Sequence, residues 1–159
     1  MKRILVAVVI VVFAALSALA GDADAIIGVW ATDPEGEGGQ AHIEISAVGD
    51  QYSGKIVWLD EPLYTADDED GEVGEPKVDK NNPDPALRSR PIVGLELMRG
   101  FTYDGKGTWK KGTIYDPDNG KTYKSKVRLS DNGVLNVRGY IGISMIGRTS
   151  HWTRVEADE

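Results

Sequence analysis

The chain has 159 residues, no cysteine, and 25 acidic against 18 basic side chains, which gives a formal net charge of −7 at pH 7. An acidic surface repels phosphate backbones and anionic membranes, so the net charge argues against nucleic acid and against a membrane surface as partners. The lack of cysteine excludes both a disulfide framework and a lipid-modified cysteine, so stability has to come from burial of a core.

The N-terminus has the three regions of a secretory signal peptide. Lys2 and Arg3 precede an apolar run over 4–16, and Ser-Ala-Leu-Ala follows over 17–20. The run is shorter than the ~20 apolar residues that a membrane-spanning helix needs, and an uncleaved anchor is the alternative. We expect a signal peptide over 1–20 that is cleaved after Ala20. A single periplasmic or secreted domain over 21–159, without stable membrane insertion, would remain.

The rest of the chain alternates apolar and polar residues in short runs, separated by turns rich in Gly, Asp and Asn. This pattern is typical of an antiparallel barrel or sandwich. Within the runs, the alternation places Ser125 and Val127 on one face and Lys124 and Lys126 on the other, and it places Trp58 inside. The predicted strands are 26–32, 41–48, 52–59, 92–99, 107–115, 122–129, 134–140 and 144–155.

Motifs in the first and last predicted strands indicate how the sheet closes. Gly28 and Trp30 stand in the first strand, and Trp152 and Arg154 stand in the last. A glycine allows close approach of neighbouring backbones, a buried indole fills one end of a barrel, and a guanidinium lies favourably over an indole. This combination is typical of lipocalin-like barrels. The sequence therefore predicts an all-β fold, a single antiparallel eight-stranded up-and-down barrel with a long loop over 60–91.

The loop over 60–91 is too long for a hairpin connection, which makes it a candidate functional segment. Its part over 65–75 is acidic, with Val73 as its one large apolar residue, so we expect this part to be mobile. Its part over 77–91 contains prolines and turn-forming Asn and Asp residues, and Leu87 offers an apolar anchor. We expect this second part to be ordered against the barrel.

Side chains suited to binding a ligand occur on the predicted strands and on the loop. Arg88 and Arg90 are candidates for ligand capture, because a guanidinium holds carboxylate or phosphate in paired hydrogen bonds. The alternative, favoured by nearby Asp79 and Asp84, is that one arginine pairs locally and fixes the loop. The predicted cavity residues are Trp58, Tyr115, Tyr123 and Met145, and the predicted lid residues are Asn82, Arg88 and Arg90.

Metal binding and catalysis find little support. The acidic run over 67–72 does not fit a calcium loop, because the required register would put Ala66 at the first ligand position and Lys77 at the twelfth. His42 and His151 have no carboxylate partners at zinc-site spacing, and no nucleophile turn accompanies them. We expect no metal, no cofactor and no catalytic residue.

Several runs together resemble one bacterial family. They are Gly-Lys-Ile-Val-Trp-Leu over 54–59, Asp-Lys-Asn-Asn-Pro-Asp-Pro-Ala-Leu-Arg-Ser-Arg-Pro over 79–91, Ile-Tyr-Asp-Pro over 114–117, Val-Arg-Gly-Tyr over 137–140 and Trp-Thr-Arg over 152–154. The chain is similar to members of the domain-of-unknown-function family number 2147. The resemblance implies an exported protein with a lipocalin-like (calycin) β-barrel, and it implies no established activity. Members commonly carry a cysteine pair before the Gly-Lys-Ile-Val-Trp run, where this chain has Asp50 to Ser53.

These observations favour a periplasmic or secreted protein that binds a small apolar or amphipathic molecule inside the barrel, without catalysis. An eight-stranded barrel has an interior just large enough for one such ligand. One alternative is a filled barrel that acts as an envelope interaction or stress protein through 77–91. A third is an enzyme of unrecognised type. The sequence does not indicate an oligomeric state.

Overall fold

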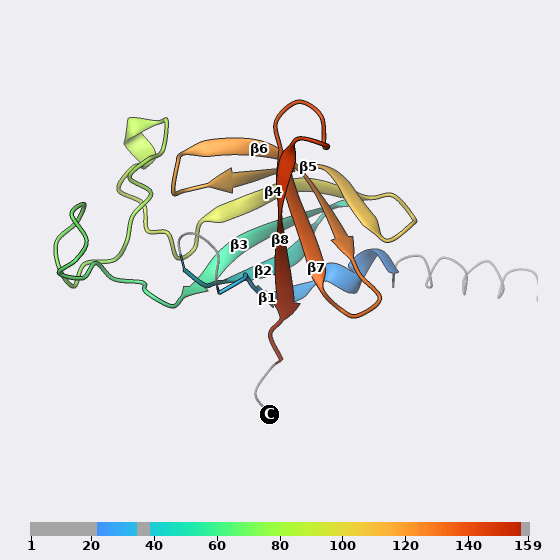
Figure 1. Ribbon diagram of the computed structural model, residues 1–159, viewed down its shortest axis with the longest axis horizontal. Helices are drawn as coiled ribbons and strands as arrows, with labels where there is room; N and C mark the ends of the chain where they lie inside the picture. The colour runs from blue at the N-terminus through green and yellow to red at the C-terminus, as the bar shows by residue number, and fades with distance from the viewer. Residues whose placement is uncertain (1–21, 35–38, 157–159) are drawn as a thin grey trace, which may run out of the picture.

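The computed structural model describes residues 22–34 and 39–156, so the expected signal peptide over 1–20 and its cleavage after Ala20 lie outside the described residues. Eight antiparallel strands form a closed barrel in which each strand pairs with the next and β8 pairs with β1 (Figure 1). The predicted eight-stranded up-and-down barrel is thereby confirmed. The strands are β1 (Gly28–Ala31), β2 (Ala41–Val48), β3 (Gln51–Leu59), β4 (Glu96–Tyr103), β5 (Thr108–Asp116), β6 (Lys121–Leu129), β7 (Leu135–Tyr140) and β8 (Gly147–Arg154).

The prediction for β4 is the least accurate. We expected a strand over 92–99, whereas β4 runs from Glu96 to Tyr103. Before it, a turn with Gly94 at φ +96° leads into the hydrogen bond from Leu95 N to Ile92 O. The strand continues past Gly100, whose φ of +72° and the register shift against β3 mark a β-bulge. Gly100 therefore bends the strand instead of ending it.

A second bulge overturns the predicted inward position of Trp58. The register pairs Ile43 with Ile56 but His42 with Trp58, so β3 has one more residue than β2 at this point. An extra residue reverses the faces beyond it. Trp58 is therefore 42% exposed and packs on His42, with ring centres 4.4 Å apart, while Leu59 lines the interior in its place.

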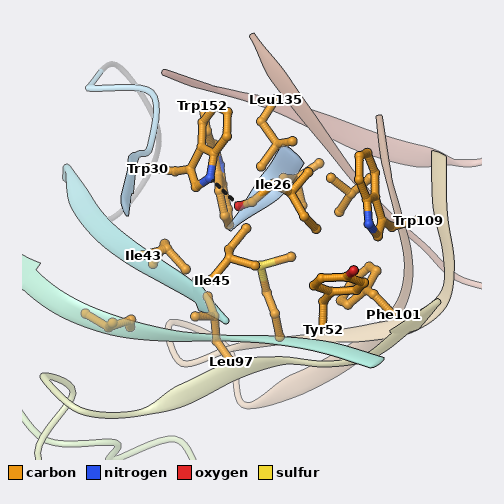
Figure 2. Packing of buried hydrophobic residues seen from close by; sticks show 14 of the residues in the cluster. Ile26, Trp30, Ile43, Ile45, Tyr52, Leu97, Phe101, Trp109, Leu135 and Trp152 are labelled. Atoms are coloured by element: carbon orange, nitrogen blue, oxygen red, sulfur yellow. Dashed lines mark hydrogen bonds between the residues drawn. The ribbon is translucent and has the colours of Figure 1, made fainter. Parts of the chain in front are cut away.

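One end of the barrel is closed by the 3₁₀ helix η1 (Asp24–Ile26), whose last residue, Ile26, the sequence predicts as the first residue of a strand over 26–32. Ile26 is fully buried, and its carbonyl accepts a hydrogen bond from Trp30 Nε1 at 2.9 Å (Figure 2). Trp109 Nε1 donates to Ala23 O at 3.0 Å, and the Tyr52 hydroxyl donates to Asp24 Oδ1 at 2.7 Å. These bonds hold η1 as a plug in the closed end.

Residues of the predicted closing motif lie around the plug. The Arg154 guanidinium carbon lies 4.3 Å from the centre of the fully buried Trp30 ring. Gly28 has φ +131°, and a Cβ there would lie 2.5 Å from Arg154 Nη1. The glycine is therefore required both by its backbone conformation and by the side chain that crosses it.

The apolar core fills the closed half of the barrel, around Ile26 and the large aromatic side chains (Figure 2). The inward residues of β6 and β7 are buried as the alternation predicts, with Ser125 and Val127 both at 0% exposure. The core residues with exposures of 3% or less are Ile26, Trp30, Ile43, Ile45, Ile56, Met98, Phe101, Trp109, Val127, Leu135, Val137 and Trp152. No helix in the described part of the chain is long and apolar enough to cross a membrane.

The loop over 60–91 extends from the other end of the barrel, at the left of Figure 1. Its acidic part, which the sequence predicts to be mobile, has a defined turn: Tyr64 N donates to Glu75 O, and Leu63 bridges to Pro76. The part over 77–91 is ordered, as predicted, but its expected anchor Leu87 is 38% exposed in a 3₁₀ turn, η2 (Pro85–Leu87). The buried polar side chain of Asp79 anchors this part of the loop instead of Leu87.

Candidate ligand cavity

A cavity of about 1200 Å³, open to solvent at its mouth, occupies the half of the barrel opposite η1 and extends between the long loop and the β5–β6 turn. Its lining comes from the last residues of β3, β5 and β7, from the first residues of β2, β4, β6 and β8, and from Thr32 and Asp33 just after β1, which all meet at this end. Ile43, Leu97 and Trp152 belong both to the packed core and to the lining, so they form the floor. The apolar wall consists of Ala41, Ile43, Ile56, Leu59, Ile92, Leu97, Ile114, Val137 and Trp152.

Two of the predicted cavity residues, Tyr115 and Tyr123, do line the cavity. The Tyr115 hydroxyl donates to Asp79 Oδ1 at 2.6 Å, and burial together with this bond and the charge of Asp79 raises the pKa of Tyr115 to about 12. The Tyr123 hydroxyl accepts a hydrogen bond from Asn119 Nδ2 at 3.1 Å. Both rings therefore face the cavity while their hydroxyls are held by neighbouring polar groups.

The rim of the cavity is charged. Lys77 Nζ lies 3.4 Å from Glu61 Oε2 and 3.9 Å from Asp68 Oδ1, so its charge is compensated within the long loop. Hydrogen bonds from the backbone and hydroxyl of Thr65 lower the pKa of Asp68. Arg148 reaches the rim from β8, opposite Gly139. The charged lining residues are Asp33, Asp60, Glu61, Asp68, Lys77, Lys80, Asp116, Asp118 and Arg148.

Asp79 anchors the ordered part of the loop. Its side chain is fully buried and accepts hydrogen bonds from the Tyr115 hydroxyl, from Asn82 Nδ2 at 2.7 Å, and from Arg90 Nη2 and Nε at 2.8 and 3.0 Å. A buried carboxylate needs such partners, because an unpaired charge is very costly away from water. The loop is thus fixed to β5 by a polar network, which supports the alternative that an arginine pairs locally.

The loop also contacts the β5–β6 hairpin. Asn81 Nδ2 donates to the carbonyls of Pro117 at 3.1 Å and Asp118 at 3.0 Å. Gly120, at φ +70°, lies against the Asn81 carbonyl so closely that no Cβ could fit. The loop therefore crosses one side of the cavity mouth, with Lys80 and Asn81 facing the space.

The predicted lid residues serve the loop itself. Asn82 is 5% exposed and binds Asp79, and Arg90 pairs with the same carboxylate. Arg88 Nε donates to Asn82 O at 2.7 Å. None of these three side chains lines the cavity. Their ligand-binding role stays a prediction without direct structural support.

Two further predicted residues lie away from the cavity. Trp58 is on the outer surface because of the β2–β3 bulge, and Met145 is 85% exposed at the tip of the β7–β8 hairpin. Its neighbours Ile141 and Ile146 line the mouth instead. Sequence reasoning missed most of the aliphatic wall, although the alternation around Ile114 and Val137 contained the signal.

Each of the two histidines contacts one neighbouring side chain. His42 stacks on Trp58, and His151 Nδ1 is hydrogen-bonded to Asn136 Oδ1 at 2.8 Å. Among the described residues, no group of three or more His, Cys, Asp or Glu side chains is placed to hold a metal ion. The arrangement around the cavity consists of an apolar interior and a polar rim.

A closed eight-stranded barrel with one plugged end and an internal cavity defines the class of lipocalin-like proteins. Residues 28–154 match the model of the family described as an uncharacterized protein conserved in bacteria (DUF2147), and the chain belongs to this family. The fold is similar to the solved structure of protein HP1028 from the human pathogen Helicobacter pylori, described as belonging to the lipocalin family. The TM-score is 0.69 at 23% identity, over 82% of this chain and 83% of that one. No curated protein matches the sequence.

Proposed function

We propose that the protein binds one small amphipathic molecule in the barrel, with the apolar part of the ligand inside and its polar part at the rim. The observation that carries this proposal is the cavity of about 1200 Å³, whose wall is aliphatic and aromatic and whose mouth is charged. Binding cavities typically measure ~300–1,000 Å³ and combine an apolar lining with a few polar groups. The family match and the lipocalin-like relative support the proposal.

The driving force for such binding is burial of the apolar part of the ligand. Each Å² of apolar surface removed from water contributes roughly 25 cal/mol, so a short alkyl chain gains several kcal/mol against the wall. The polar head of the ligand keeps its hydration at the mouth, where the side chains of the rim are charged. Catalysis is not part of the proposal.

The alternative hypothesis of a filled barrel has less support. The core packs the half that contains η1 and reaches the floor of the cavity, whereas the rest of the other half contains the open cavity. We further propose a periplasmic or secreted location, which rests on the N-terminal Lys-Arg pair, the apolar run and Ser-Ala-Leu-Ala over 17–20. Cell fractionation with an antibody against the chain tests the location, and recovery in the cytosol overturns it.

A cavity-filling variant tests the binding proposal. Gly139 lies on the cavity wall, and a Cβ there would make ordinary contacts of 3.5 Å with Ile114 and 3.6 Å with Tyr123. Gly139→Leu should therefore fill part of the cavity while the barrel stays folded. Thr113→Leu is the control, because it introduces the same leucine on β5 outside the set of lining residues.

The probes are N-phenyl-1-naphthylamine, followed by fluorescence, and palmitate and lysophosphatidylcholine, followed by thermal shift and native mass spectrometry. We expect at least one probe to bind with a one-to-one ratio, and we expect Gly139→Leu to weaken its binding about tenfold or more while Thr113→Leu does not. Bare protein in native spectra, with no shift from any probe, overturns the proposal. Binding that is equal in both variants places the ligand outside the cavity and overturns it as well.

A further inference from the structure

The β7–β8 hairpin ends in an exposed apolar loop, which projects at the top of Figure 1. Ile141 is 68% exposed, Ile143 61%, Met145 85% and Ile146 70%. Single exposed apolar residues are common on proteins, but a contiguous group of large ones marks an interaction surface. We call this loop, residues 141–146, the apolar tip.

The outer face beside the apolar tip is basic. Lys124, Lys126 and Arg128 alternate outward along β6, and Arg138 on β7 lies directly opposite Lys126. Like charges in opposite positions destabilise a sheet. Within the described residues, no salt bridge joins any of these four side chains to a carboxylate. The arrangement costs stability unless an anionic partner neutralises it.

The net charge of the chain conceals this surface. Over 121–155 the sequence has seven basic residues, at 121, 124, 126, 128, 138, 148 and 154, against one acidic residue, Asp131. The long loop over 60–91 has ten acidic residues against four basic ones. The basic and the acidic side chains therefore gather in different parts of the molecule. An anionic surface would orient the protein with β6 and β7 facing that surface.

The basic side chains and the apolar tip form one unit. Arg138 Nε donates to Ser144 O at 2.7 Å, and its Nη2 donates to Met145 O at 3.1 Å. Lys126 Nζ donates to Ser144 Oγ at 3.5 Å. The tip is thus folded back onto the basic face, so apolar and cationic groups reach a common surface together.

We propose that the apolar tip and the basic face of β6 and β7 dock onto a lipid bilayer that contains anionic headgroups. Peripheral membrane attachment requires apolar side chains that enter the headgroup region and basic side chains that attract anionic lipids. A soluble polyanion explains the lysines and arginines but leaves the exposed isoleucines without a partner. Ile141 and Ile146 also line the cavity, so the apolar tip lies at the edge of the mouth.

Sedimentation with vesicles tests this proposal on the purified protein, and the test is independent of any cavity ligand. We expect the protein to sediment with vesicles that contain phosphatidylglycerol and much less with phosphatidylcholine alone. Lys124→Glu combined with Lys126→Glu should weaken binding about tenfold or more, since each basic residue near an anionic surface contributes ~1 kcal/mol, or about fivefold. Ile143→Ser combined with Met145→Ser should weaken it by a similar factor.

Matched controls are available at other parts of the molecule. Val48→Ser changes a 59% exposed residue at the β2–β3 turn, and Lys106→Glu changes an exposed lysine at the β4–β5 turn. Both variants should bind vesicles as the unchanged protein does. Absence of sedimentation with phosphatidylglycerol vesicles overturns the proposal, as does full binding by the Ile143→Ser, Met145→Ser variant. Retention on heparin without vesicle binding would assign the basic face to a soluble polyanion.

Discussion

Arg154 and Trp30 form the contact that closes the barrel, with the guanidinium carbon 4.3 Å from the centre of the indole ring. The same guanidinium donates to Ile27 O at 2.8 Å from Nη1 and to Ala25 O at 2.6 Å from Nη2. The β1–β8 seam has two paired positions, Trp30 with Arg154 and Ala31 with Thr153. One side chain therefore joins the last strand, the first strand and the plug.

Removal of this side chain should destabilise the protein. We expect Arg154→Ala to lower the free energy of unfolding by about 2 kcal/mol, from the lost cation–π contact and two charged hydrogen bonds, reduced by solvent exposure. Arg154→Lys keeps the charge but cannot reach both carbonyls in the same geometry, so it should recover only part of the loss. Urea unfolding measures both variants, and an unchanged Arg154→Ala protein would show that the stacking contributes nothing.

Asp79 should be a larger determinant of stability than any exposed ion pair. Asp79→Ala leaves Arg90, Asn82 and Tyr115 without their common acceptor, and we expect a loss of about 3 kcal/mol. Glu44→Ala, which removes the exposed pair with Lys55, is the control and should cost less than about 1 kcal/mol. Thermal unfolding of the two variants gives the comparison. A cost for Asp79→Ala no larger than that of the control contradicts the role of Asp79 as the loop anchor.

Tyr52 and Tyr115 should lose their phenolic protons at a higher pH than an exposed tyrosine does. The pKa of Tyr52 is raised to about 12 by burial, the hydrogen bond to Asp24 and the charge of that carboxylate, and Tyr115 behaves in the same way beside Asp79. The unfolded side chains lose their protons near pH 10. Between pH 10 and about 12 the folded state binds more protons, so its stability should fall as the pH rises through this window and be fully present below it.

Ultraviolet absorbance of phenolate measures this behaviour. Of the six tyrosines in the chain, Tyr52 and Tyr115 should contribute a phase near pH 12. Tyr52→Phe and Tyr115→Phe should each remove about half of that phase. Circular dichroism at each pH confirms that the barrel remains folded during the titration. A single phase near pH 10 in the folded protein is the contrary outcome.

Lys111 has the backbone conformation of a glycine. Its φ is +65°, beside the register shift between β5 and β6, and this conformation costs a residue with a Cβ about 1–2 kcal/mol. Lys111→Gly should therefore raise the free energy of unfolding by about 0.5–1 kcal/mol after the greater entropy of the unfolded glycine is subtracted. Thr113→Gly in the same strand, where φ is negative, should be destabilising instead. Guanidinium unfolding distinguishes the two signs.

Sequence reasoning predicted the strands best where alternation and turn residues agree. The β2 strand matches the prediction at both ends, and β6 and β7 differ by one residue each. It failed where one inserted residue changes the face of a strand. Trp58 is outside and Leu59 inside because of the β2–β3 bulge, and a bulge depends on the pairing of two strands that no single run of residues records.

For the loop residues, too, one part could be predicted from the sequence and another part could not. The run over 79–91 indicated a rigid and polar segment, and the proximity of Asp79 to two arginines indicated a local ion pair. Which arginine pairs could not be predicted, because the choice of Arg90 depends on the Val78–Pro91 bridge that brings the two ends of the segment together. Tyr115 joins from a distant strand, with no signal in the local sequence.

The sequence by itself indicated the barrel and the rigidity of the loop, because alternation and turn residues act through local geometry, and it indicated the closing contact because Gly28, Trp30 and Arg154 stand in the first and last predicted strands. Only the tertiary structure decided which half is packed and which half is hollow, since η1 plugs one end and the strand ends at the other enclose the cavity. It also decided where the charges gather. Net charge is a sum over the chain, whereas interaction with a partner depends on the side chains that share a face.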